Sequence, residues 1–319
     1  MSEQNALPTR DAFGDEILAL GMENPDIYVI DCDIGKSCKT TAFSSQLPGQ
    51  HVNVGIAEQN ACGVAAGLAS CGKTPFVCTY AVFGSMRMLE QIRQSVCYTN
   101  LNVKIACSHG GFTPANDGAS HQGIEDMGIM RTLPNMTVIM GCDYNATRKL
   151  VRAAAQMKGP VYLRFTRDAV PQICSQEEEF EIGLAKQLRN GKDAAIIANG
   201  DVLSLALDAA DRLAKQGIEV RVLDMHTIKP LDTTAVESAL RECGAVVTVE
   251  DHNIINGLGS AVCEVAATLG IGKVSRIGIR DQFGESAPYE HLLQKNGITV
   301  EEIQRAILGL LEDQRQQTH

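Results

Sequence analysis

The feature of this sequence that most restricts its fold is the alternation of short β-branched runs with longer helical stretches. In the first half, such runs occur at 27–34 (IYVIDCDI), 74–80 (TPFVCTY), 102–109 (NVKIACSH), 136–143 (MTVIMGCD) and 160–166 (PVYLRFT). The stretch 83–100 lies between two of them and carries Met86, Leu89, Ile92 and Val96 at helical spacing. Strands separated by helices predict a mostly parallel sheet that is covered on both faces.

A polar stretch at 171–193 interrupts this alternation. It contains the acidic run 177–179, which is typical of a solvated segment, so we predict a linker at 181–192. The alternation then resumes, with strands predicted at 194–200 (AAIIANG), 219–225 (EVRVLDM) and 245–251 (AVVTVED), and helices at 202–217 and 260–270. The prediction is therefore an α/β protein of two domains, 1–180 and 193–319, each a mostly parallel sheet with helices on both faces.

Composition excludes several classes of protein. A net charge of −10 argues against binding to nucleic acid or to anionic membranes. No apolar run approaches the ~20 residues that cross a bilayer, and the first residues do not resemble a secretory signal. The 11 cysteines form no Cys-x-x-Cys pair, and Cys62, Cys71 and Cys263 lie in apolar segments. We therefore expect reduced thiols in a cytoplasmic protein, rather than a disulfide framework or a zinc site.

Three segments are candidates for chemistry. The GLG at 257–259 lacks the third glycine of a dinucleotide loop, because Val262 stands there, so a tight strand–helix turn is the better interpretation. The long loop 108–126 holds His109, Asp117 and His121, which could bind a metal or sugar hydroxyls, or could be purely structural. Glu58 is the one acid in NVGIAEQNACGVAAG (53–67), where it is either used by a ligand or is a first-turn acid favoured by the helix dipole.

Taken in order, several motifs resemble one family, the C-terminal half of transketolase, a thiamine diphosphate enzyme that transfers two-carbon ketol units between sugar phosphates. The motifs are TRDAFG (9–14), DCDIGKS (31–37), NVGIAEQN (53–60), TYAVF (79–83), HGGFTPANDGASHQ (109–122), RTLPNMTVIMGCD (131–143), YLRFTRD (162–168) and VRVLDMHTIKPLD (220–232). The resemblance covers nearly the whole chain. It implies a pyrimidine-binding domain followed by the transketolase C-terminal domain.

The resemblance also implies how the cofactor ring is held. Glu58 would hydrogen-bond the N1′ atom of the aminopyrimidine ring, which requires a carboxyl that holds or shares a proton near neutral pH. Tyr80, Phe83 and Met86 would form the apolar pocket of that ring, with Phe83 stacked on its face. The family often has an aromatic residue at the Met86 position, which a flexible thioether can fill. Asp33 corresponds to an acid near the cofactor and the subunit contact.

Further residues match the substrate site of the family. His121 and Asp117 would contact substrate hydroxyls, with His121 the better proton-transfer partner because imidazole titrates near pH 7. The family's phosphate site is matched from four separate segments, by Arg10, Ser37, His109 and Arg167. Arginine offers paired donors to a phosphate, so such a cluster would supply local positive charge on an otherwise acidic protein.

One part of the family's site has no counterpart in this sequence. In the family, a Gly-Asp-Gly segment and a later asparagine hold the diphosphate and its divalent metal, whose oxygen ligands suit Mg²⁺. This chain has no Gly-Asp-Gly, and it begins where the family's pyrimidine-binding domain begins. We therefore expect one subunit of a split transketolase, with Mg²⁺ held by a partner subunit in an α₂β₂ tetramer.

Other interpretations stay open on the sequence. The β subunit of a 2-oxoacid dehydrogenase shares the two-domain layout and a similar glutamate, although the four-part phosphate cluster speaks against it. A deoxyxylulose-phosphate synthase-like half is a second neighbour. A non-catalytic partner subunit is the third, and the presence of both Glu58 and His121 weighs against it. The particular sugar phosphates are not predicted by any of these motifs.

Overall fold

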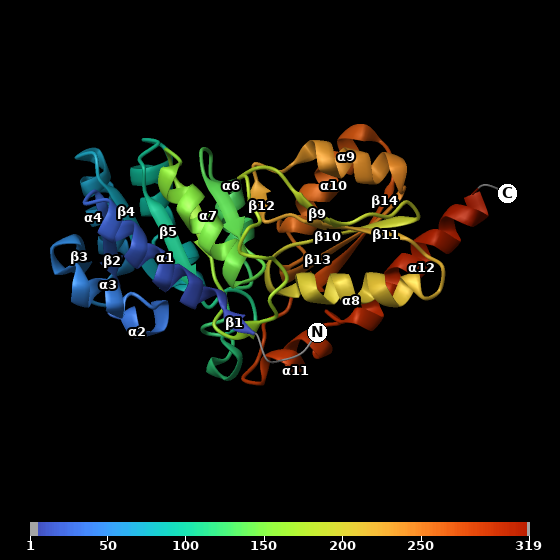
Figure 1. The fold of residues 1–319 in the computed structure, drawn as a ribbon, viewed down its shortest axis with the longest axis horizontal. Coiled ribbons are helices and arrows are strands. Elements are labelled where there is room, and N and C mark those ends of the chain that lie inside the picture. Colours follow the sequence, from blue (N-terminus) through green and yellow to red (C-terminus); the bar gives the residue numbers. More distant parts are fainter. Residues whose placement is uncertain (1–5, 318–319) are drawn as a thin grey trace.

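The computed structural model describes residues 6–317 and contains two α/β units that lie side by side (Figure 1). The first is built on a seven-stranded sheet with the order β12-β6-β7-β5-β4-β2-β3. The strands are β2 (Ile27–Asp31), β3 (His51–Asn53), β4 (Thr74–Tyr80), β5 (Lys104–Ser108), β6 (Thr137–Met140), β7 (Val161–Arg164) and β12 (Thr227–Lys229). Neighbouring strands are parallel except at the β12–β6 edge. The predicted doubly covered parallel sheet is therefore confirmed.

Helices cover both faces of this sheet because its central strands are apolar on both sides. In β4, Phe76 and Cys78 pack on one face, whereas Val77 packs on the other. The Phe76 face is covered by α1 (Thr9–Glu23), α3 (Thr41–Gln46) and α7 (Tyr144–Gln156). The Val77 face is covered by α4 (Glu58–Ser70), the π-helical turns η3 (Phe83–Arg87) and η4 (Ile92–Cys97), and α6 (Asp126–Thr132). The single helix predicted at 83–100 is thus divided into π-helical turns around the short α5 (Leu89–Gln91).

The second unit is built on a five-stranded sheet with the order β14-β13-β10-β11-β9. Its strands are β9 (Lys186–Arg189), β10 (Ala194–Ala198), β11 (Val220–Asp224), β13 (Ala245–Asn253) and β14 (Lys273–Ile279). Alternate residues of β10 face α8 (Leu203–Ala214) and α12 (Val300–Gln317) on one side, and α9 (Thr233–Glu242) and α10 (Leu258–Leu269) on the other (Figure 1). The second predicted sheet is also confirmed.

Two short strands depart from the predicted division. β9 lies inside the stretch 181–192, which we predicted as a linker, yet it pairs antiparallel with β11 as the edge of the second sheet. That part of the linker prediction is wrong, because the polar sequence of an edge strand resembles a loop. β12 comes from the second half of the sequence but joins the first sheet beside β6, so the two units share a sheet edge.

The remaining elements are short. They are β1 (Leu7–Pro8) with β8 (Ala169–Val170), α2 (Gly35–Cys38), α11 (Tyr289–Lys295), and the 3-10 turns η2 (Pro48–Gln50), η5 (Ala115–Asp117) and η6 (Gly200–Val202). The GLG at 257–259 forms the turn into α10, with Gly257 at the N-cap, as predicted. Within residues 6–317, every helix is too short or too polar to span a lipid bilayer.

Candidate active site

The sequence-predicted site residues gather at one edge of the first sheet. In a parallel sheet the carboxyl ends of the strands share an edge, and ligands bind in the crevice outside it. Asp33 follows β2, Tyr80 ends β4 and His109 follows β5. Glu58 begins the helix after β3, while Arg167 lies three residues beyond β7. The topology therefore explains why motifs that are far apart in the sequence meet.

Glu58 is buried at the start of α4, with 3% of its surface exposed. Its partner is Arg87, the last residue of η3, whose Nη1 donates to Glu58 Oε1 at 3.0 Å and to Oε2 at 2.9 Å. The Arg87 side chain is 48% exposed. The same guanidinium lies over the Phe83 ring, 4.3 Å from its centroid. A flat group that bears N–H donors thus bonds the Glu58 carboxylate and covers one face of the Phe83 ring.

A connected set of rings continues from Phe83. Phe83 and Tyr80 stack with their centroids 5.9 Å apart. Tyr80 in turn stacks on His109 at 3.9 Å. His121 meets Phe83 and Tyr80 edge-on, at 5.6 and 5.9 Å. The two histidines predicted from one loop are therefore brought against two of the three residues predicted to form an apolar pocket.

The predicted phosphate cluster lies next to these rings. Burial, together with the charges of Arg10 and Arg167, lowers the pKa of His109 to about 3. His109 is therefore neutral at pH 7 and would serve as a hydrogen-bonding group rather than as a cation, with Nδ1 2.8 Å from Ser108 Oγ. Arg10 donates to the backbone carbonyl of Ser37 at 3.2 Å. The positive charge of the cluster thus comes from its two arginines.

Loop geometry supports a specialised role for this edge. His109 has a φ of 64° and Asp33 has a φ of 66°, in the left-handed region where residues other than glycine are uncommon. In the loop after β5, Asp117 lies 3.5 Å from the guanidinium of Arg167, which also donates to the Pro114 carbonyl. The predicted sugar-binding aspartate and one predicted phosphate-binding arginine are therefore an ion pair.

Two predicted residues lie at the margin of this constellation. Asp33 is exposed and accepts a hydrogen bond from Asn53 at 3.1 Å. Met86 is exposed on η3, beside Arg87. Sequence reasoning missed Arg87 itself, although its position four residues after Phe83 predicts that the two share a helical face. It also missed Asp168, which lies beside the cluster. Burial raises the pKa of Asp168, while the charges of Arg167 and Arg10 act in the opposite direction.

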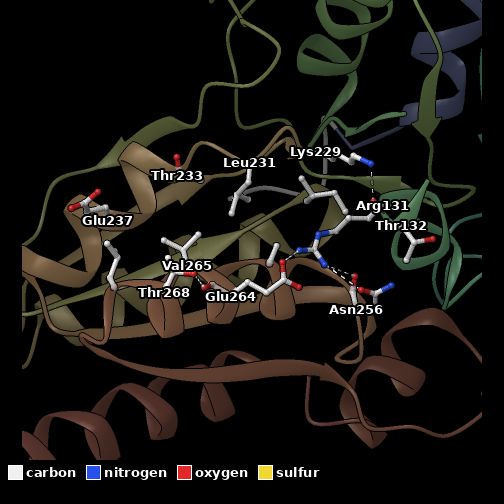
Figure 2. A pocket seen from close by; sticks show the side chains of 13 residues that line it. Arg131, Thr132, Lys229, Leu231, Thr233, Glu237, Asn256, Glu264, Val265 and Thr268 are labelled. Atoms are coloured by element: carbon white, nitrogen blue, oxygen red, sulfur yellow. Dashed lines mark hydrogen bonds and ion pairs between the residues drawn. The ribbon is translucent and has the colours of Figure 1, made fainter. Parts of the chain in front are cut away.

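A separate cavity of about 550 Å³ lies away from this edge, between β12, α9 and α10 (Figure 2). Arg131 lines this cavity and bonds to Glu264 and to Asn256 Oδ1. Lys229 donates to the backbone carbonyl of Arg131 at 2.9 Å. The contacts of Arg131 and Lys229 therefore mainly hold α6 against the second unit. The cavity shares no residue with the Glu58 constellation.

Comparison with known families gives two matches. The transketolase pyrimidine-binding domain matches residues 5–172, and the transketolase C-terminal domain matches residues 183–303. The predicted linker, 181–192, overlaps the interval between these matches.

Several known proteins are similar over most of their length. The 6-deoxy-6-sulfo-D-fructose transketolase subunit SqwH of Clostridium sp. (strain MSTE9) is 40% identical over 93% of this chain and 92% of its own. One subunit of the apulose-4-phosphate transketolase of Phocaeicola vulgatus is 39% identical over 87% of this chain and 89% of its own. A solved structure described as a split gene transketolase, inactive beta4 tetramer, is 46% identical with a TM-score of 0.90, covering 96% of this chain and 99% of that one.

A further relative is matched only in part. The 1-deoxy-D-xylulose-5-phosphate synthase 1 of Geobacter sulfurreducens is 37% identical over 90% of this chain, but the match covers 45% of that protein.

Proposed function

Because this chain belongs to the transketolase family, we propose that it is the pyrimidine-side subunit of a thiamine diphosphate enzyme that transfers a two-carbon ketol unit between sugar phosphates. Both family domains and the full-length similarity to named transketolase subunits support this function. The deoxyxylulose-phosphate synthase interpretation has weaker support, because that relative is matched over less than half of its length.

The observation that carries the proposal is the joint engagement of Glu58 and Phe83 by one planar, nitrogen-bearing group. The Arg87 guanidinium bonds the buried carboxylate and covers the ring. An aminopyrimidine ring is also flat and carries nitrogen donors, so the residues present fit it. Glu58 would hold or share a proton at N1′, and Phe83 would fix the plane of the ring. When bound, the cofactor supplies the carbon nucleophile and the electron sink for cleaving the ketose C2–C3 bond.

The remaining residues would act on the sugar. His121 lies edge-on to Phe83, so it would exchange a proton with a substrate hydroxyl beside the cofactor ring. Asp117 would accept hydrogen bonds from hydroxyls, after Arg167 turns from it toward a phosphate. Arg10 and Arg167 would bind the phosphate as cations, while His109 and Ser37 would act as neutral groups. Tyr80 would keep the rings of Phe83 and His109 in place by stacking against both.

We assign the other half of the cofactor site to a partner subunit. This chain has no Gly-Asp-Gly segment, so the diphosphate and its Mg²⁺ would be held elsewhere. Two similar proteins are named as subunits, and a 46% identical chain is described as an inactive tetramer of beta chains, which supports a need for a second chain type. We propose an α₂β₂ assembly. All 11 cysteines are unpaired thiols, which supports a cytoplasmic location.

The experiment pairs this chain with the subunit that carries Gly-Asp-Gly, in the presence of thiamine diphosphate and Mg²⁺. Given a five-carbon ketose phosphate and a five-carbon aldose phosphate, ketol transfer yields three-carbon and seven-carbon sugar phosphates, which mass spectrometry identifies. The pair should be active and this chain alone inactive. Glu58→Gln in the pair should lower the rate at least about 100-fold, the range of a lost proton-transfer group.

Glu90→Gln is the matched control, because Glu90 is an exposed acid on α5 of the same unit. It should leave the rate unchanged. Turnover by this chain without a partner would overturn the split assignment, and near-normal transfer by the Glu58→Gln pair would remove Glu58 from the mechanism. Decarboxylation of 2-oxoacids by the pair, without ketol transfer, would favour the dehydrogenase β subunit instead. The relatives act on different sugars by their names, so a panel of ketose phosphates should follow.

A further inference from the structure

Two buried thiols and two buried carboxylates meet where the units join. Cys142 lies between β6 and α7, and Cys174 lies in the segment that follows β8. Their sulfur atoms are 3.8 Å apart. The ligand atoms of Cys142, Asp143 and Cys174 all lie within 4.8 Å of one another, and all three residues are buried. The cluster shares no residue with the Glu58 constellation.

Asp143 organises this cluster. One of its oxygens accepts from Ala146 N at 2.8 Å and caps α7. The other accepts from Ile173 N at 2.7 Å and from Cys174 N at 2.6 Å, which holds the connecting segment against the first unit. A carboxylate has about four lone-pair positions, so one remains for a further partner.

Asp224 supplies a second, independent observation. It is the last residue of β11 in the second unit, and its side chain is fully buried. Neither of its carboxylate oxygens accepts a hydrogen bond from an N–H or O–H group among residues 6–317. Its neighbour in the cluster is the Cys142 thiol, which is only a weak hydrogen-bond donor. A buried carboxylate that has no N–H or O–H partner is costly unless something else binds it.

We propose that Cys142, Cys174, Asp143 and Asp224 bind one Zn²⁺ ion that clamps the two units and their connecting segment together. Two sulfurs bound to tetrahedral Zn²⁺ at about 2.3 Å lie about 3.8 Å apart, which is the separation seen here. Thiolates with carboxylate oxygens suit Zn²⁺, whereas Mg²⁺ and Ca²⁺ prefer oxygen alone. On binding, each thiol releases its proton to solvent.

The proposed site is structural rather than catalytic. Its protein ligands come from three segments, so the ion would replace the missing partners of Asp224 and tie β11 to α7. Sequence spacing carried no signal for it, because 31 residues separate Cys142 from Cys174 and the zinc motifs considered use Cys-x-x-Cys pairs. A zinc ion here would be distinct from the Mg²⁺ that we assign to the partner subunit.

The test measures metal in the full-length chain itself, expressed with zinc in the medium and purified without chelators. Elemental analysis should find about one Zn²⁺ per chain, and a thiol-blocking mercurial should release it. Chain grown with Co²⁺ instead should show a thiolate-to-cobalt charge-transfer band, which reports sulfur ligation directly. Removal of the metal should lower the melting temperature.

Asp224→Asn and Cys174→Ser should each reduce bound zinc to below about one fifth of an ion per chain and abolish the cobalt band. Cys97→Ala is the matched control, because Cys97 is a buried thiol outside the cluster, and it should keep full zinc. Wild-type chain with no zinc and no cobalt band would overturn the proposal even if every variant misfolds. A Cys142–Cys174 disulfide found by mass spectrometry in freshly purified, zinc-free chain would also overturn it.

Discussion

Among single residues, Arg87 has the clearest consequence for ligand binding. Its guanidinium bonds Glu58 and covers Phe83, so a cofactor ring that binds as we propose would displace it from both. The side chain is half exposed and can turn toward solvent. We expect Arg87→Ala to tighten thiamine diphosphate binding by the assembled pair about five-fold, because an ion pair of this exposure is worth about 1 kcal/mol. Isothermal titration calorimetry measures this without depending on turnover.

Arg93→Ala is the control for this prediction. The Arg93 side chain is exposed on η4, and within residues 6–317 its hydrogen bond goes to the neighbouring Gln94 side chain. It should leave the dissociation constant unchanged. Weaker binding by Arg87→Ala would show instead that Arg87 helps to hold the cofactor after turning.

Motifs that resemble the transketolase family predicted Glu58, Phe83, His109 and His121 as members of one site. In the structure, Arg87 joins Glu58 to Phe83, and ring contacts join Phe83 and Tyr80 to the two histidines. Arg87 was not identified, because the residues considered in its segment were the apolar ones at three-residue intervals. The pairing of Asp117 with Arg167 was also beyond reach, since it depends on how a long loop folds back.

Among elements, α10 depends on a carboxylate from the neighbouring strand. Glu250 in β13 accepts from Leu258 N at 2.7 Å and from Gly259 N at 2.8 Å, at the start of the helix. A Cβ atom on Gly257 would lie 2.0 Å from Glu250 Oε2, so the GLG turn is required by this close approach. Burial raises the pKa of Glu250 from 4.5 to about 7, against the lowering effect of those two backbone donors.

This shift predicts a pH dependence of stability. Because the folded pKa lies above the unfolded one, the contribution of Glu250 is fully present below pH 4.5 and is lost as the pH rises through about 7. Between about pH 5 and pH 8, the free energy of unfolding of wild type should therefore fall by about 2 kcal/mol relative to Glu250→Gln. Urea unfolding at several pH values measures the difference.

Glu264→Gln is the control for that slope, because Glu264 lies on the same helix and is mostly exposed. The free energy of unfolding of Glu264→Gln should differ from that of wild type by a constant amount across this pH range. A Glu250→Gln difference that stays constant with pH would contradict the assignment of the titration to Glu250.

Much of the element pattern was predictable, because buried parallel strands such as β4 and β10 are continuous apolar runs bounded by turns. β9 was mistaken for linker, since its sequence is polar and one of its edges is unpaired. β12 could not be assigned to the first sheet, because local patterning does not say which sheet edge a three-residue strand will join. The division of 83–100 into π-helical turns could not be predicted either, because a π-helical turn leaves the spacing of the apolar residues almost unchanged.

For the whole molecule, the proposed role of Glu58 predicts where a partner would bind. Glu58 lies at the start of α4, and some apolar side chains near it are exposed to solvent. Ile56, two residues earlier, is 74% exposed, and Met86 beside Arg87 is exposed as well. Half of a cofactor site that opens on an apolar face should be completed by a chain that covers this face.

Ile56→Lys should therefore weaken association with the partner subunit. Losing one large apolar contact and burying an ammonium group costs about 2 kcal/mol or more, which corresponds to about 30-fold in the dissociation constant. Met22→Lys is the control: Met22 is 58% exposed but lies in the last turn of α1, on the opposite face of the sheet from α4. Both variants should keep the melting temperature of the isolated chain, since neither residue is buried there. Sedimentation velocity of each variant with the partner measures the complex, and equal weakening by both would show that the partner does not approach along the Glu58 face.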